Sequence, residues 1–203
     1  SNVVLNGLYV YYRGGRVSNI LKTFNHVNMN LDVDGQRVGR KDIANYKQTL
    51  NMKKGVLVTS FDVGDKVQVT HSMMSLRHLP FTALTIVEIR AKKNVVITPM
   101  SVIEAPTHLT DVRNLFSEID RPHVKIPLLT SVGKSPSGKH TLAVSNSLIF
   151  NEPHGKEPAL IHEDWDYNMH LLKFSQTLKA GESYRFSMVS SATSTGHYDD
   201  PIN

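Results

Sequence analysis

The sequence predicts an all-β protein built as an antiparallel sandwich. Val, Ile and Thr number 21, 11 and 14, against only 8 Ala and 7 Glu, and this composition is typical of strands rather than of helix bundles. Apolar and polar residues alternate over many short segments separated by turn signals, which indicates about nine to twelve strands. The chain has 203 residues, enough for one sizeable domain. We therefore interpret residues 1–203 as a single β-sandwich domain.

Two hairpins have the clearest signals. Residues 56–63 and 66–73 each place apolar side chains on one face, and Gly64-Asp65 separates them. The alternating segment 29–33 ends at Asp34-Gly35, a pair that tolerates positive φ, before the chain turns back. Both patterns predict two antiparallel strands joined by a tight turn.

The remaining strands follow from alternation and from Pro and Gly. Segment 81–89 is apolar on both faces and is predicted to be a central, sandwiched strand. In the strand that begins at Val95, Pro99 cannot donate a ladder hydrogen bond, which predicts an edge position or a bulge. Three further strands are expected at 141–150, 167–174 and 183–189, the last two joined through Ala180-Gly181.

One segment departs from the strand pattern. Apolar residues between Leu109 and Ile119 fall at helical spacing, and Thr107 is placed to cap a helix, so we expect a short helix there. Residues 121–138 hold three Pro, two Gly and three Ser, and they predict a long irregular excursion.

Composition also excludes some classes of binding partner. Lys and Arg exceed Asp and Glu by 23 to 18, but the basic residues are spread thinly, whereas nucleic-acid binding needs them clustered. No apolar run approaches the ~20 residues that span a bilayer. The chain contains no Cys, which excludes disulfides and Cys-based zinc sites. We expect no cofactor, no nucleic acid and no membrane partner, and the compartment is not indicated.

The most unusual cluster surrounds the only Trp of the chain, in the run from His162 to Tyr167. Three alternatives stay open. The carboxylates could hold a hard cation, although the spacing of a calcium loop is missing. Trp165 could stack on a sugar ring while neighbouring groups bind its hydroxyls, or it could be tucked into the core from a loop or strand edge. We predict no metal site and no catalytic residue, and the candidate carbohydrate-binding residues are His162, Glu163, Trp165, Asp166 and Tyr167.

A family resemblance extends these inferences. It rests on the Asp34-Gly35 turn after Leu31-Asp-Val33, on Tyr46-Lys-Gln-Thr-Leu50-Asn-Met52-Lys-Lys-Gly55-Val56-Leu57, and on Ser75-Leu76-Arg77-His78-Leu79-Pro80. These stretches resemble the N-terminal domain of glycoside hydrolase family 65, which includes maltose, trehalose and kojibiose phosphorylases and related hydrolases. Ser190 to Ser194 and Asp199-Asp200-Pro201 resemble the stretch before that family's linker.

The resemblance implies a two-sheet antiparallel supersandwich, like that of galactose mutarotase, packed against a helical (α/α)6 barrel. In that family the barrel carries the catalytic acid, and this chain ends at Asn203, before a barrel could begin. The function expected is therefore that of a non-catalytic domain of an enzyme acting on α-glucosides, which braces the barrel and shapes its active-site entrance. An excised domain of this kind exposes a normally buried patch, so we expect self-association or a homodimer.

Two other functions remain as alternatives. One is a stand-alone carbohydrate-binding sandwich that uses the cluster around Trp165. The other is a small independent enzyme that uses Glu163 and Asp166. The start at Ser1-Asn2 rather than Met is typical of a processed or excised chain.

Overall fold

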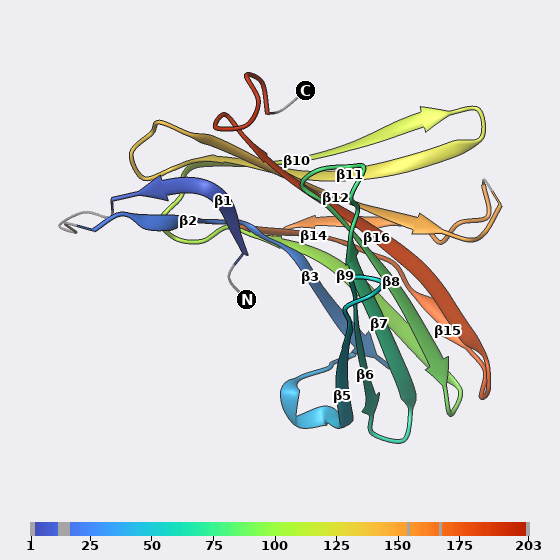
Figure 1. The fold of residues 1–203 in the computed structure, drawn as a ribbon. Helices are drawn as coiled ribbons and strands as arrows, with labels where there is room; N and C mark the ends of the chain where they lie inside the picture. Colours follow the sequence, from blue (N-terminus) through green and yellow to red (C-terminus); the bar gives the residue numbers. More distant parts are fainter. Residues whose placement is uncertain (1–2, 12–16, 154, 167, 202–203) are drawn as a thin grey trace.

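The protein is described here by a computed structural model that covers residues 3–11, 17–153, 155–166 and 168–201. These residues form sixteen strands and one short 3-10 helix, η1 (Arg40–Asp42). The predicted all-β, antiparallel architecture is confirmed: two large curved sheets pack face to face, with a two-stranded ribbon beside them (Figure 1). The described residues contain no helix long and apolar enough to cross a membrane.

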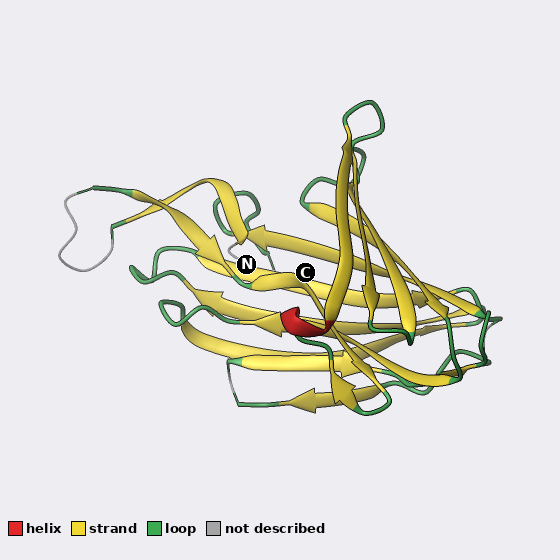
Figure 2. Ribbon diagram, turned by 90° about the horizontal axis from the view of Figure 1, so that it is seen from below, coloured by secondary structure: helices red, strands yellow, loops and turns green. Residues whose placement is uncertain are grey.

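The larger sheet has eight strands in the order β10-β11-β12-β16-β8-β7-β6-β5. Their bounds are β10 (Thr110–Arg121), β11 (Val124–Lys134), β12 (Thr141–Phe150), β16 (Ser183–Ser194), β8 (Thr82–Ala91), β7 (Val67–Ser75), β6 (Val56–Val63) and β5 (Ile43–Asn51). Figure 2 shows the hairpin of β5 and β6 rising away from the rest of the sandwich, with η1 at the start of β5.

The smaller sheet has the order β13-β14-β9-β3-β4, and β15 pairs with β9 beyond the end of β14. The ribbon consists of β1 and β2. The bounds are β13 (Ile161–Asp164), β14 (Met169–Lys173), β9 (Val95–Glu104), β3 (Asn25–Val33), β4 (Gln36–Arg37), β15 (Gln176–Leu178), β1 (Val3–Val10) and β2 (Asn19–Thr23).

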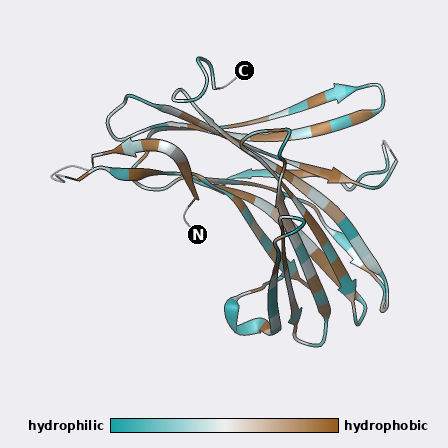
Figure 3. Ribbon diagram, viewed as in Figure 1, coloured by the Kyte–Doolittle hydropathy of each residue, from teal (hydrophilic) through white to brown (hydrophobic). Residues whose placement is uncertain are grey.

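The core lies between the two large sheets. Hydrophobic and hydrophilic residues alternate along many of the strands (Figure 3), and alternate side chains of a strand point to opposite faces of its sheet. At its centre Phe174 makes edge-to-face contacts with Phe150 and Phe186, with ring centroids 4.9 and 5.1 Å apart. These contacts join the end of β14 to β12 and β16, and they fix the smaller sheet on the larger one.

Both predicted hairpins are confirmed. β6 and β7 pair from Val63↔Val67 outward, across Gly64 with φ 52°. β3 turns into β4 through Asp34 and Gly35, whose φ values are 51° and 77°. Two successive positive φ angles give the type I′ turn that matches strand twist.

The predicted helix and the predicted excursion are both wrong. Residues Thr110–Arg121 form β10, and most of the expected excursion forms β11, which pairs with β10 from Thr110↔Lys134 to Arg121↔Val124. Hydrogen bonding to the neighbouring strand overrides the helical spacing of the apolar residues. The rest of the excursion is two turns: Pro122-His123 joins β10 to β11, and residues 135–138 form a turn closed by the Gly138 N–H donating to the Ser135 carbonyl.

Pro99 lies in the middle of β9, which is a central strand, so the expected edge position is wrong. The Pro99 carbonyl accepts from the Phe174 N–H, and its missing N–H therefore faces the same side, where β14 ends and β15 begins. An interruption in the neighbouring strand accommodates the proline in place of a bulge.

Segment 81–89 is central as predicted, because β8 lies between β16 and β7. Its two apolar faces have different surroundings. Val87 and Ile89 are buried between the sheets, whereas Leu84 and Ile86 lie half-buried on the outer face. The strand is therefore covered on one face only by the described residues.

Candidate functional site

The run from His162 to Asp164 forms the edge strand β13, and alternation sends its side chains to opposite faces of the smaller sheet. His162 stacks on Phe116 of the larger sheet, with ring centroids 4.8 Å apart, so it points inward. Asp164 also points inward, because its Oδ1 accepts from Asn114 Nδ2 at 3.1 Å. Glu163 and Trp165 therefore lie on the outer face.

Trp165 is not tucked into the core, since half of it (50%) is exposed to solvent. Its backbone N–H donates to the Met169 carbonyl at 2.9 Å and continues the pairing of β13 with β14. Its indole Nε1–H donates to Glu163 Oε2 at 2.8 Å. The ring is thus held in one orientation at the edge of the outer face.

Glu163 is in turn held by Lys173, which forms an ion pair with its Oε1. The hydrogen bond from Lys173 lowers the pKa of the Glu163 carboxyl, with a smaller contribution from the Trp165 indole. The carboxyl therefore stays ionised through the neutral range. Lys173, Glu163 and Trp165 form a chain of contacts across two strands.

The inward groups form a buried link between the sheets. His170 is fully buried; its Nε2 lies 2.8 Å from Ser131 Oγ, and its Nδ1 lies 3.4 Å from His162 Nε2. Burial first, and then the neighbouring His162, lower the pKa of His170 to about 4. His162 and His170 therefore join β13 and β14 to the larger sheet.

Asp166, another predicted residue, lies in the turn that follows β13. Asp166 has φ 68° and accepts through its backbone carbonyl, from the Met169 N–H at 3.2 Å and from Asn114 Nδ2 at 3.5 Å. It shapes the turn between β13 and β14. Tyr167 lies outside the described residues.

The register adds residues to the outer face that the sequence analysis missed. Met169 pairs with Glu104, Leu171 with Val102, and Val102 with Asn28. Asn30 stands opposite Met100 on the same face. The alternation of Asn28, Asn30 and Asp32 with buried residues was a signal for a polar stripe on this strand.

This outer face has an apolar floor with polar groups around it. The floor consists of Met100, Val102 and Leu171, and Met169 packs against it. Met100 is only 4% exposed, and Arg37 Nη2 lies 3.1 Å from its Sδ. We call this surface the Trp165 face, defined by the rim residues Asn28, Asn30, Glu104, Glu163, Trp165, Met169 and Lys173 over that floor.

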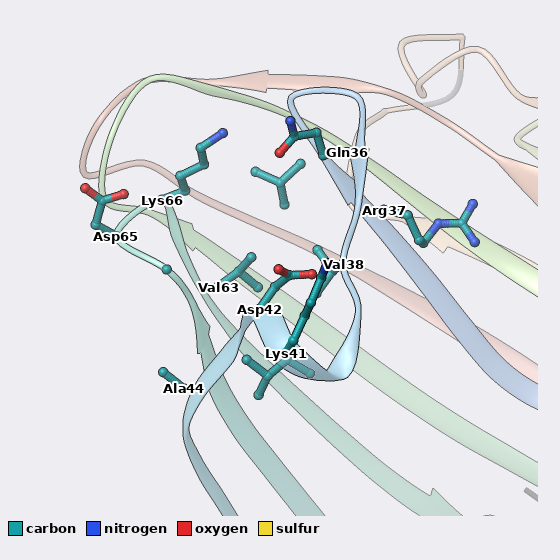
Figure 4. Close-up of a pocket in the computed structure, with 12 residues that line it drawn as sticks. Gln36, Arg37, Val38, Lys41, Asp42, Ala44, Val63, Asp65 and Lys66 are labelled. Atoms are coloured by element: carbon teal, nitrogen blue, oxygen red, sulfur yellow. The ribbon is translucent and has the colours of Figure 1, made fainter.

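A cavity lies elsewhere, at the end of the sandwich between η1 and the turn from β6 to β7 (Figure 4). Its volume is about 690 Å³, and Val33 and Val63 are among its lining residues. Its charged groups have local partners: Asp42 Oδ2 accepts from the Gly39 N–H at 2.8 Å, and Lys66 pairs with Asp34 at 2.6 Å. Arg37 points away from the cavity in Figure 4. These groups stabilise the junction of the turns.

The outer face of the larger sheet is apolar over five strands. One row across it reads Ser147–Val189–Leu84–Met74–Val56, and the next reads Ile149–Ser187–Ile86–Ser72–Val58. No described element covers these rows, and Ile149 is 48% exposed. We call these two rows the apolar band. A row with Arg185, Glu88 and Lys47 borders it.

The described residues contain no group of three or more His, Asp or Glu side chains that could hold a metal ion. The site therefore consists of two sheet surfaces, the Trp165 face and the apolar band, on opposite sides of one core.

Comparison with known proteins decides the family. The model of the glycosyl hydrolase family 65 N-terminal domain matches residues 3–202. The chain belongs to this family. The predicted resemblance, which includes the motifs from Leu31 to Pro80 and the stretches near the end of the chain, is thereby confirmed.

Two curated relatives of this family 65 domain are kojibiose hydrolases. The protein from Mucilaginibacter mallensis is 45% identical over 202 residues, and the protein from Flavobacterium johnsoniae is 39% identical over 201 residues. The alignments cover 100% and 99% of this chain but only 30% of each relative. The chain thus spans about a third of the length of the curated relatives it matches.

Solved structures share the fold. A structure described as a kojibiose phosphorylase from the human microbiome superposes with a TM-score of 0.66 at 10% identity, over 89% of this chain and 23% of that one. A mutant of the heparan sulfate lyase HepC from Pedobacter heparinus gives a TM-score of 0.52 at 12% identity, over 82% and 24% of the two chains. At such low identity these likenesses concern the fold alone.

Proposed function

We propose that this family 65 N-terminal domain is a non-catalytic support for the catalytic domain of an enzyme acting on α-glucosides. The apolar band is the observation that carries the proposal, and the names of the two relatives point to kojibiose as the substrate of the whole enzyme. The occupant we propose for the band is the helical catalytic barrel of the same polypeptide. The (α/α)6 barrel itself is what the family resemblance implies.

The dimensions of the band suit such an occupant. Five adjacent strands span about 20 Å, and the two rows lie about 7 Å apart along the strands. A helix with its side chains is about 10 Å wide, so two neighbouring helices would cover the band. Exposed apolar patches of this extent on a protein surface mark interaction sites. The Ser residues between the apolar side chains leave room for a close approach.

One edge of the larger sheet extends the surface. The hairpin of β10 and β11 projects beyond β12 (Figure 1) and exposes Leu115, Ile119 and Val124. At the opposite edge, the exposed Leu50 lies on the other face of the sheet, in the row of Leu57, Met73 and the buried Thr85. We propose that the β10–β11 hairpin reaches the mouth of the barrel and shapes the active-site entrance.

The support role is tested by placing a charge in the band of the full-length enzyme. Ile86→Lys, at the centre of the band, is compared with Thr70→Lys, which lies on the same face in the row that holds Glu88. We expect Ile86→Lys to shorten several-fold the half-life of the enzyme's kojibiose-hydrolysing activity at elevated temperature. The reason is that burying a charge in the interface is costly. Thr70→Lys should leave it unchanged.

A milder variant keeps this test informative. Ile86→Ser introduces a residue already common on this face and should give an intermediate half-life. Each of the three substitutions should leave the melting temperature of residues 1–203 near that of the unchanged chain, since Ile86 and Thr70 both lie outside the core. Equal half-lives for Ile86→Lys and Thr70→Lys would contradict the proposal.

The entrance role has its own readout. Replacing the tip of the β10–β11 hairpin, residues 119–126, by a short Gly-Ser turn should raise KM for the glucoside while kcat stays within about twofold. Loss of kcat with an unchanged KM would contradict a role at the entrance.

A further inference from the structure

We propose that the Trp165 face binds a neutral carbohydrate. This inference does not depend on the proposed support role, because the Trp165 face and the apolar band lie on opposite sides of the sandwich. A sugar has flat apolar faces and a periphery of hydroxyl groups.

The aromatic group is already positioned. Half of Trp165 is exposed, and its indole N–H is fixed by Glu163, which Lys173 holds from the next strand. A ring restrained in this way loses little freedom when a ligand stacks on it. The exposed ring therefore offers a ready apolar platform at one edge of the face.

The hydrogen-bonding groups lie across the sheet from the ring. Asn28, Asn30 and Glu104 make no side-chain hydrogen bond to another described residue, and all three lie on the outer face by register. Two amides and one carboxylate supply both donors and acceptors, which suits the hydroxyl groups of a sugar. These groups are available for a ligand.

The spacing fits a small oligosaccharide. Glu163 on β13, Leu171 on β14, Val102 on β9 and Asn28 on β3 form one row across four strands. Three strand intervals amount to about 14 Å, a length that accommodates two linked pyranose rings. Buried Leu171 and Val102 form the middle of this row, between the polar side chains of Glu163 and Asn28 at its ends.

The charge of the face favours a neutral ligand over an anionic one. Glu163 is paired with Lys173, and Asp32 with Arg37 at 2.5 Å. Glu104 forms no ion pair with a described residue, so one negative charge is left over. A sulfated or carboxylated glycan would meet this charge at close range, whereas a neutral sugar can donate hydroxyl hydrogen bonds to it.

The experiment uses the fact that Trp165 is the only Trp of the chain, so intrinsic fluorescence reports on this face. Residues 1–203 are titrated with maltose, with cellobiose and, as an anionic probe, with heparin. We expect a saturable change in Trp165 emission with at least one of the two disaccharides, with a Kd between about 0.1 and 10 mM. Heparin should leave the emission unchanged.

Variants place the ligand. Asn30→Ala and Glu104→Gln, which keep the fluorophore, should each weaken binding by about tenfold. Ile86→Lys, on the opposite face, should leave the Kd unchanged. Trp165→Ala, followed by calorimetry in place of fluorescence, should abolish the binding heat while the melting temperature stays near that of the unchanged chain.

Three results would overturn the proposal. One is an emission that does not change with either disaccharide. Another is a response to heparin alone, which would show an anionic ligand. The third is a Kd that Asn30→Ala and Glu104→Gln leave unaltered, which would place the sugar elsewhere. Failure of this test leaves the Ile86→Lys experiment unaffected, so the two proposals are separable.

Discussion

The two outer faces of this sandwich are built by the same alternation of side chains, yet they differ in chemistry. On the larger sheet, Ile149 is 48% exposed and lies in rows of apolar and Ser residues. On the smaller sheet, Met100 is only 4% exposed, and the Arg37 guanidinium lies against its sulfur. The outer face of the larger sheet therefore exposes apolar surface, whereas the apolar floor of the smaller sheet is buried.

This difference separates two kinds of surface. Open apolar rows gain free energy when a second macromolecular layer removes them from water. A covered floor with polar groups around it gains little from such a layer, but it can exchange water for the hydroxyl groups of a small ligand. On this basis we propose that one side of the fold docks a second domain and that the other side binds a sugar.

The largest effect we expect is a difference in unfolding free energy between a variant in the core and a variant on the Trp165 face. Phe174→Ala should cost about 3–5 kcal/mol of unfolding free energy, because it removes the ring at the centre of the aromatic cluster. Trp165→Ala should cost less than about 1 kcal/mol, because its ring lies half-exposed at an edge. Urea unfolding of both variants measures the difference, and equal losses would show that Trp165 belongs to the core.

Acid should loosen the attachment of the Trp165 face to the larger sheet. The pKa of His170 is lowered to about 4, from 6.5, so between these values the unfolded chain binds a proton that the folded chain does not. Stability contributed by the neutral ring is complete above pH 6.5 and is lost as the pH falls towards 4, by about 3 kcal/mol. Burial lowers the pKa of His26 and His71 in the same direction.

Melting temperatures between pH 7 and pH 4 check this dependence. His170→Gln removes the titrating group and should flatten the curve relative to the unchanged chain. A stability that rises as the pH falls through this window would contradict the assignment.

A smaller loss is expected at the turn that leads from the Trp165 face into β4. Gly35 has φ +77°, which a β-branched side chain rarely adopts, so Gly35→Val should cost about 1–2 kcal/mol. Gly39→Ala is the matched control, since Gly39 has an ordinary φ of −106°. Thermal melts of the two variants should differ, and matching melts would remove the strained turn from the account.

The weakest effect concerns the apolar band in the isolated chain. Residues 1–203 should self-associate at high concentration through this surface, and Ile86→Lys should shift the chain towards the monomer. Light scattering coupled to size exclusion measures both. Thr70→Lys is the control, and a similar shift with it would indicate a general effect of charge.

The sequence was most informative where structure is decided locally. Asp34-Gly35 and Gly64-Asp65 carry the residue types that hairpin turns need, and both hairpins are present. The β10–β11 hairpin turns through Pro122-His123 instead, without a Gly or Asn signal, while its apolar residues fall at helical spacing. Pairing with the neighbouring strand decides its structure, and periodicity alone does not reveal pairing.

Only part of the candidate site could be predicted from the sequence, for the same reason. Trp165 and Glu163 could be singled out as an unusual pair, and alternation places them on one face, apart from His162. Asn28 and Glu104 join them only through β9, which pairs with both β3 and β14. Residues so far apart in the chain become neighbours through sheet register, which no short motif records.

Methionine oxidation measures whether the rest of the enzyme covers the apolar band and leaves the Trp165 face open, as we propose. Met74 lies in the apolar band and Met169 on the Trp165 face, and both are half-buried in this chain. Their rates of sulfoxide formation with hydrogen peroxide would be measured by mass spectrometry in residues 1–203 and in the full-length enzyme. We expect Met74 oxidation to fall several-fold in the full-length enzyme while Met169 oxidation is unchanged. Protection of Met169 with no protection of Met74 would contradict it.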